Sequence, residues 1–185
     1  MTLHLFPDYD LSKHTWLGVG GKADWFAEVS DEQTLISFLK NSQCPLTILG
    51  EGSNVLIRDR GISGVVLKLG SDFKKIKKVD DTIVVGAGVK MMNIARIACE
   101  VGLAGFEFME GIPGTLGGGL FSNAGAFGGK LSDLLQELSF VDFRGNKMIF
   151  SDFSDWGYRY SPLAGKGIFL GAILKAKNID LHNKI

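Results

Sequence analysis

Residues 111–129, GIPGTLGGGLFSNAGAFGG, form a dense run of glycine and other small residues. Ordering glycine loses more backbone entropy than ordering other residues, so such a run needs a compensating gain. A flat ligand lying on the backbone would provide that gain. Pro113 stiffens a turn, Gly114 can adopt a positive φ, and Thr115 can cap a short helix whose open N–H groups attract an anion. The run therefore predicts a ligand site, with tight structural packing as the alternative.

A second glycine loop, Gly50-Glu51-Gly52-Ser53-Asn54, follows a short apolar strand expected at residues 46–49. Successive N–H groups in such a turn can form a nest for an anion, to which the Ser53 hydroxyl and the Asn54 amide add donors. A phosphate suits this chemistry, and a plain polar turn is the alternative. The run at 111–129 is not a nucleoside triphosphate loop, because no Gly-Lys-Ser/Thr ends it, and its glycine spacing does not match the dinucleotide-binding βαβ fingerprint.

Two further segments are candidates for the same site. Residues 158–162, YRYSP, place Arg159 between aromatic side chains, where its planar fork suits a carboxylate or a phosphate. A surface arginine stacked on tyrosine is the alternative. Residues 16–23, WLGVGGKA, are either a wall of the pocket or an ordinary strand turn. The three histidines lack metal-ligand spacing, so no metal site is expected.

The apolar periodicity predicts an α+β fold with more strands than helices. Helices are expected at 32–42, after an Asp31 N-cap, and at 91–101, before Gly102 as a C-cap. A strand pair or a turn-containing strand is expected within 16–29, and further strands at 46–49, 55–57, 64–69, 73–79, 82–86, 134–142, 147–150 and 168–175. This order is not the regular βαβ alternation of a doubly wound fold.

The composition narrows the class of protein. The 185 residues are 45% hydrophobic and carry a formal net charge of zero, so no global field would attract nucleic acid or an anionic membrane. The lysines within 74–78 are interpreted as a solvated strand face. Because no signal peptide or membrane-spanning run is found, we expect a cytoplasmic protein. Cys44 and Cys99 lie among apolar residues and are expected to be buried free thiols, which implies a reducing compartment.

Four segments occur in an order that resembles the UDP-N-acetylenolpyruvoylglucosamine reductase family over nearly the whole chain. They are KHTW with VGGKA at 13–23, ILGEGSNVL at 48–56, GIPGTLGG with NAGA at 111–126, and YRYS at 158–161. The resemblance implies a two-lobed FAD-binding domain of the vanillyl-alcohol-oxidase (PCMH) type. The first lobe would comprise residues 1–72 and the second residues 73–178, followed by a polar tail at 179–185.

The resemblance also assigns roles to residues. The pyrophosphate of FAD would be cradled by Gly50, Glu51, Gly52, Ser53, Asn54 and Val55. The flavin and its phosphates would lie along Gly111, Ile112, Pro113, Gly114, Thr115, Gly117, Gly118, Asn123, Ala124, Gly125 and Ala126. Some related oxidases attach the flavin to a histidine in the first loop, but Glu51 and Ser53 stand there in this chain, so non-covalent FAD is expected. Arg159 matches the family's catalytic arginine, which binds the substrate carboxylate and stabilises an enolate-like intermediate.

In this family NADPH reduces the flavin, which then passes hydride to UDP-N-acetylglucosamine enolpyruvate to form UDP-N-acetylmuramate for peptidoglycan. The resemblance has one gap. Family chains continue into a third, substrate-binding domain that brings a proton-donating serine and a glutamate, and neither motif is found after Ile168. Three alternatives follow: a reductase of this family, an FAD-binding module without autonomous catalysis (truncated or completed by a second chain), and a flavin oxidoreductase acting on another substrate.

Overall fold

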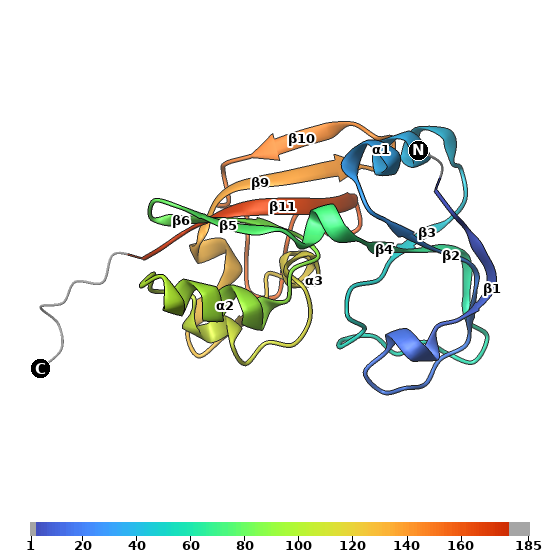
Figure 1. Ribbon diagram of the computed structural model, residues 1–185, viewed down its shortest axis with the longest axis horizontal. Coiled ribbons are helices and arrows are strands. Elements are labelled where there is room, and N and C mark those ends of the chain that lie inside the picture. Colours follow the sequence, from blue (N-terminus) through green and yellow to red (C-terminus); the bar gives the residue numbers. More distant parts are fainter. Residues whose placement is uncertain (1–2, 178–185) are drawn as a thin grey trace, which may run out of the picture.

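The computed structural model describes residues 3–177, and the polar tail expected at 179–185 lies outside them. The chain begins with a four-stranded sheet in the order β1-β2-β4-β3, at the right of Figure 1. Its strands are β1 (Phe6–Asp10), β2 (Lys22–Val29), β3 (Leu46–Ile48) and β4 (Ile62–Leu69). β1 is antiparallel to β2, whereas β2, β4 and β3 run parallel to one another. The carboxyl ends of these three parallel strands therefore meet at one edge.

Helix α1 (Glu32–Asn41) connects β2 to β3 and begins where the sequence predicts. The Asp31 carboxylate accepts hydrogen bonds from the backbone N–H and the hydroxyl of Thr34, at 2.8 Å each. The helix ends at Ser42, whose N–H donates to the Phe38 carbonyl. Leu35 and Leu39 are buried on the inner face, which explains the apolar periodicity of this segment.

A second, antiparallel sheet follows in the order β10-β9-β11-β6-β5. The strands are β5 (Ile76–Val79), β6 (Thr82–Gly86), β9 (Leu135–Asp142), β10 (Lys147–Phe150) and β11 (Gly167–Lys175). Helices α2 (Met91–Glu100) and α3 (Leu116–Phe121) cover one face of this sheet (Figure 1). A short hairpin, β7 (Gly125–Ala126) and β8 (Gly129–Lys130), completes the glycine-rich run. Short 3-10 turns η1 to η4 are Ser12–His14, Ser71–Lys74, Glu107–Met109 and Leu131–Asp133.

The main hydrophobic core is continuous between the two sheets. It joins α1 and one face of the first sheet to α2, α3 and the second sheet. A smaller core on the other face of the first sheet includes Leu11, Phe26, Leu49, Ile57 and Val66. The mixed arrangement confirms the expected α+β fold class, and the sheets join through η2.

Two sequence-based expectations are wrong, and a third segment follows one of its two alternatives. Residues 55–57 form no strand, because β4 already has β2 and β3 as its two neighbours and only Ile57 of the three is buried. Within 16–29 the turn-containing strand is confirmed and the strand pair is wrong, because a turn at 16–17 precedes β2. β2 pairs with β1 and β4, and the mostly exposed residues of β1 gave no alternation. Cys44 and Cys99 are free thiols as expected, but both are exposed rather than buried: Cys44 lies in the loop between α1 and β3, and Cys99 lies near the end of α2.

Candidate functional site

The first glycine loop leaves the first sheet at the carboxyl edge of its parallel strands. Ligands of open parallel sheets bind outside such edges. Gly52 has φ +67°, and a Cβ atom there would lie within 1.9 Å of the His14 carbonyl oxygen. The Trp16 N–H donates to the Gly52 carbonyl at 3.1 Å. The backbone of the third glycine cluster, residues 16–23, is thus in direct contact with this loop, and only glycine fits at position 52.

The backbone N–H groups of residues 50–54 donate no hydrogen bond to any atom of residues 3–177. Paired backbone groups are the rule in folded proteins, so such a row of free donors is suited to a ligand or to solvent. Gly52 is buried, whereas Gly50, Glu51 and Ser53 are half-buried and Asn54 is exposed, so the loop lies partly at an accessible surface.

The second glycine run is bound firmly to the segment before α2. The Met91 N–H donates to the Gly114 carbonyl at 2.9 Å, and the Leu116 N–H donates to the Val89 carbonyl at 2.8 Å. Thr115 is buried and caps α3 as predicted, since its Oγ1 accepts from the Gly118 N–H at 3.4 Å. The run therefore has a fixed position before any ligand binds.

The two glycine segments meet. A Cβ atom at Gly50 would lie 2.9 Å from Thr115 Oγ1. A Cβ atom at Gly114, which has φ +105°, would lie 2.8 Å from Ser53 Oγ. The tertiary structure thus brings together the two segments that the sequence singled out, with hydroxyl groups of both at the junction. We call this junction, residues 50–55 with 113–118, the two-loop cradle.

The cradle is bordered by charged groups that the sequence patterns did not single out. Lys90, directly before α2, forms an ion pair with Glu51 at 3.0 Å. Burial lowers the pKa of Lys68, near the end of β4, while the Glu51 carboxylate acts in the opposite direction. Burial also lowers the pKa of His14, whose ring stacks on Tyr9 and Phe26 with centroids 5.6 and 4.9 Å apart. For Lys68 the available sequence signal was a lysine within the apolar run at residues 65–69.

A pocket of about 400 Å³ lies beyond the cradle, between the β7–β8 hairpin and the turn that carries Arg159. Its lining includes Asn123, Phe127, Lys130, Tyr158 and Arg159. A Cβ atom at Gly111 would lie 3.5 Å from the Phe127 ring, so the start of the glycine run borders this pocket's rim. Phe127 and Tyr158 are 93% and 91% exposed, which marks two aromatic walls open to a ligand or to another surface.

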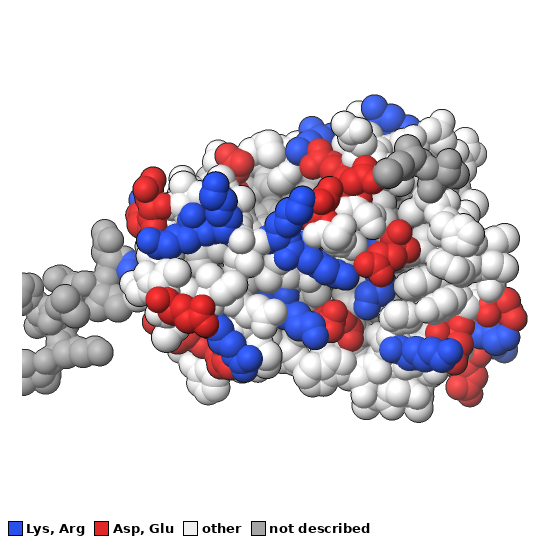
Figure 2. All heavy atoms as spheres, in the orientation of Figure 1, with Lys and Arg blue, Asp and Glu red and all other residues white. Residues whose placement is uncertain are grey.

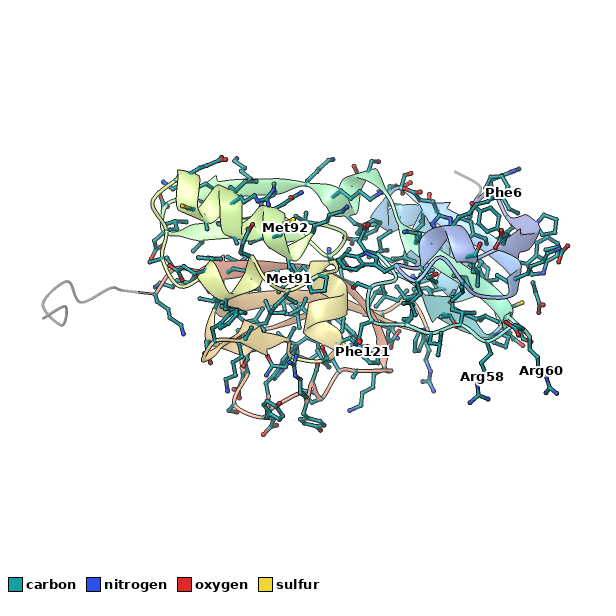
Figure 3. All side chains as sticks on the ribbon, turned by 90° about the horizontal axis from the view of Figure 1, so that it is seen from below. Phe6, Arg58, Arg60, Met91, Met92 and Phe121 are labelled. Carbon is teal, nitrogen blue, oxygen red and sulfur yellow. The ribbon has the colours of Figure 1, made fainter. Side chains whose placement is uncertain are left out.

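Arg159 occupies a tight turn. The Gly157 and Tyr160 backbones exchange two hydrogen bonds of 3.2 Å, and Arg159 has φ +54°. Its side chain is exposed, with the guanidinium carbon 5.8 Å from the Tyr158 ring centre. The predicted stacking on an aromatic ring is therefore present, and the guanidinium remains accessible. By contrast, Arg58 and Arg60 are exposed and point away from the rest of the chain (Figure 3).

The other predicted site residues divide into two groups. Ala124 lies in the main core and Ile112 and Ala126 pack against it, while Ala126 also lines the pocket beside Arg159. Gly111, Pro113 and Gly118 are exposed, whereas Gly117 and Gly125 are half-buried.

The lysines of β5 and the preceding turn are exposed, as predicted, and charges of both signs intermingle on the face shown in Figure 2. Among residues 3–177, no helix is long and apolar enough to cross a membrane.

Comparison with known proteins agrees with this geometry. A family model described as an FAD binding domain matches residues 25–150. The UDP-N-acetylenolpyruvoylglucosamine reductases of Rickettsia typhi and Rickettsia prowazekii are 41% and 42% identical over 180 residues, 95% of this chain. The chain spans 61% of the length of these relatives. The resemblance expected from the four segments is thereby confirmed.

Solved structures show the same fold. The UDP-N-acetylenolpyruvylglucosamine reductase of Thermus caldophilus has a TM-score of 0.81 at 30% identity, covering 95% of this chain and 62% of that one. A cholesterol oxidase of Brevibacterium sterolicum (TM-score 0.66, covering 94% of this chain and 38% of that one) is 18% identical, which is a likeness of fold alone. A vanillyl-alcohol-oxidase-type flavoprotein of Myceliophthora thermophila (TM-score 0.61, 84% and 32%) is also 18% identical. Because the matched family model covers more than half of its residues, this chain belongs to the FAD-binding domain family.

Proposed function

We propose that this chain binds FAD non-covalently, with the pyrophosphate in the two-loop cradle. The observation that carries this proposal is the row of free backbone N–H groups at residues 50–54, in a loop whose Gly50 lies next to the hydroxyl of Thr115 in the second run. Donors held by a rigid fold stabilise an anion without reorganising. The residues present therefore fit a pyrophosphate.

The charges around the cradle support the same assignment. Glu51 would repel a pyrophosphate if it stood alone, but its ion pair with Lys90 offsets that charge. Lys68 adds a half-buried cation near Glu51. We further propose that the flavin lies along the backbone of residues 111–118 and 123–126, toward the pocket beside Arg159. The two sheets would then be the two cofactor-binding lobes, residues 1–72 and 73–178.

Non-covalent attachment is proposed from the side chains at the cradle. The loop offers Glu51 and Ser53, neither of which forms the histidine linkage known from related oxidases. His14 is the nearest histidine along the chain, and its ring is held between Tyr9 and Phe26 while its Nε2 lies 3.1 Å from the Tyr9 hydroxyl.

For the reaction, we propose NADPH-dependent reduction of UDP-N-acetylglucosamine enolpyruvate to UDP-N-acetylmuramate, a cytoplasmic step of peptidoglycan synthesis. The support is the 41% identity to Rickettsia enzymes that carry the reductase name. Bound FAD would supply the redox chemistry, accepting hydride and donating it to the enolpyruvyl double bond. Arg159 would bind the substrate carboxylate through its planar fork and stabilise the negative charge that develops beside it.

The exposure of Arg159 limits what this part of the chain can do alone. In water the Coulomb energy between unit charges is about 20-fold weaker than in a dry interior with a dielectric constant near 4. We propose that full activity requires a cover over the pocket, contributed by further polypeptide or by a second chain. Such a cover would also bring the proton donor that reduction of the double bond requires.

Titration of the purified chain with FAD tests the proposal. We expect a flavin absorbance spectrum shifted from that of free FAD, and release of the flavin on denaturation because no covalent bond forms. Riboflavin, which lacks the pyrophosphate, should bind at least about 10-fold more weakly if charged hydrogen bonds are worth 1.5–3 kcal/mol each. A chain that stays colourless with excess FAD would refute the proposal, and equal affinity for riboflavin would refute the placement of the pyrophosphate.

A further inference from the structure

Asn123 links the second glycine run to the turn that carries Arg159. Its Nδ2 donates to the Gly157 carbonyl at 2.8 Å and to Ser132 Oγ at 3.1 Å. Its Oδ1 accepts from the Ser132 N–H at 3.0 Å. The residue is only 2% exposed. Both amide hydrogens and the amide oxygen are therefore engaged within the protein, which leaves the side chain no donor to offer a ligand.

The turn that receives this hydrogen bond is strained. Arg159 has φ +54°, a region that long side chains rarely adopt, and only one reciprocal backbone pair, Gly157 with Tyr160, closes the turn. Such conformations persist when their surroundings hold them. The Asn123 amide is the buried group that fixes the Gly157 carbonyl, at the entrance of the turn.

Asn123 itself suits this position for a physical reason. Its backbone has φ +45°, a region that asparagine and aspartate tolerate better than other residues with side chains. It also directly precedes residues 124–126 of the run, so one residue sets the direction of the backbone there and bonds to the Arg159 turn. The cofactor-lining run and the candidate substrate-binding arginine are thereby coupled through a single side chain.

We infer that Asn123 is a positioning residue for Arg159, acting through the Gly157 carbonyl, and that its side chain does not contact the cofactor. This inference rests on the role of Arg159 in the proposed function, and it goes beyond it by assigning the amide to the turn. It predicts that losing the amide donors weakens the substrate response while FAD remains bound.

The Asn123→Asp variant removes both donors, and it also places an ionisable carboxylate at a buried position. Aspartate keeps the shape, the tolerance of a positive φ and an acceptor for the Ser132 N–H, but it cannot donate to the Gly157 carbonyl. Asn146→Asp is the matched control, because Asn146 donates through Nδ2 to Asp142 at 2.9 Å in the exposed β9–β10 turn. Ser132→Ala is a second control, because it removes one acceptor of the Asn123 amide and keeps the bond to Gly157.

Amide hydrogen exchange of the whole chain is the first measurement. In Asn123→Asp the Gly157 and Tyr160 amides should exchange about 10-fold faster, the loss expected for one buried hydrogen bond. Amides inside β9 and β11 should keep their wild-type rates. A parallel rise at all of these amides would show a general structural role and overturn the inference, as would unchanged exchange at Gly157 and Tyr160.

The second measurement uses FAD-loaded protein titrated with UDP-N-acetylglucosamine enolpyruvate, followed by the change in flavin absorbance. The apparent affinity should fall about 10-fold in Asn123→Asp, and the Asn123→Asp/Arg159→Ala double variant should be no weaker than Arg159→Ala alone. Fully additive losses would contradict action through Arg159. Loss of FAD from Asn123→Asp alone would instead show that the side chain holds the cofactor.

The outcomes separate this inference from the proposed function. A wild-type chain that binds no FAD refutes the proposed function, and the hydrogen exchange of the apo chain still decides the role of Asn123. If Asn123→Asp does not fold, Asn123→Gly decides instead, because glycine tolerates the positive φ and has no amide to donate to the Gly157 carbonyl. That variant should raise exchange at Gly157 and Tyr160 by about 10-fold, since the buried hydrogen bond to the turn is lost. Wild-type exchange at these amides in Asn123→Gly would then overturn the inference.

Discussion

The loop of residues 50–55 and the run of residues 111–129 are both rich in glycine, but they use it for different physical reasons. In the first loop the backbone donors stay free, and Gly52 allows a close approach to the His14 carbonyl. In the second run many glycines serve packing. A Cβ atom at Gly117 would lie 3.2 Å from Ala87, and one at Gly119 would lie 2.8 Å from the buried Leu131.

The hairpin part of the run follows the same pattern. Cβ atoms at Gly125 and Gly129 would lie 2.5 Å from the Gly129 carbonyl and 2.6 Å from the Phe108 ring. The alternative of tight packing therefore accounts for a large part of the run, and the entropy argument for a ligand applies to its exposed members, such as Gly118. Glycine density alone does not distinguish a binding surface from a packed one.

Arg159→Ala should give the largest effect and separates chemistry from cofactor binding. Reoxidation of the reduced flavin by UDP-N-acetylglucosamine enolpyruvate should slow by about 10²- to 10³-fold, the usual loss when one charge-stabilising group is removed. Affinity for FAD should stay within about 2-fold, because the first loop rather than Arg159 holds the pyrophosphate. Arg60→Ala, at an exposed arginine that points outward, is the control. Equal loss of FAD from the Arg159 variant would make the arginine structural.

Gly52→Ala should damage the first loop. The variant combines a positive φ with a clash against the His14 carbonyl, strain of about 1–3 kcal/mol, so FAD affinity should fall about 10- to 100-fold in a calorimetric titration. Gly18→Ala is the matched control, since Gly18 has φ +65° and no atom within 4 Å of an added Cβ. Undiminished FAD binding in Gly52→Ala would place the cofactor away from this loop.

Two adjacent positions in α3 should respond in opposite ways. Gly119→Ala should lower the free energy of unfolding by about 1–3 kcal/mol, because the added methyl group overpacks the core at Leu131. Gly118→Ala should raise it by about 0.5–1 kcal/mol, because its Cβ would meet only Thr115 Oγ1, at 3.7 Å, and alanine favours the helix. Urea unfolding of both variants measures the difference. Equal destabilisation would show that Gly118 is also a packing glycine.

Acidification should have the smallest effect of these changes, a slight loss of stability of the folded chain. Burial lowers the pKa of His14 in the folded chain, so the unfolded chain binds its proton more readily. The stability that depends on neutral His14 is present above the unfolded pKa of about 6.5 and is lost as pH falls below it. pH 7.5 and pH 5 lie on the two sides of a histidine pKa of about 6.5. Between them, the melting temperature should drop slightly more in the wild type than in His14→Gln. Identical drops in melting temperature would show that His14 does not contribute to the acid sensitivity.

Local patterns predicted the elements that local forces specify. The cap at Asp31 and the periodicity of α1 and α2 depend on neighbours in sequence, and the structure confirms them. The strand expected at 55–57 was wrong and β1 was missed, because edge and pairing choices depend on which partners β4 already has. Lys68 and Lys90 were missed as candidates for the same reason, since only the fold brings them near Glu51.

By itself the sequence determined that this chain has two glycine segments suited to anions and an arginine suited to a carboxylate, since these follow from residue chemistry. Its ordered segments also led to the FAD-binding domain family. Only the tertiary structure decided that Gly50 meets Thr115, that Gly119 is a packing glycine, and that Asn123 bonds to the Gly157 carbonyl. These are contacts between atoms far apart along the chain, and their distances depend on how both sheets pack around the shared core.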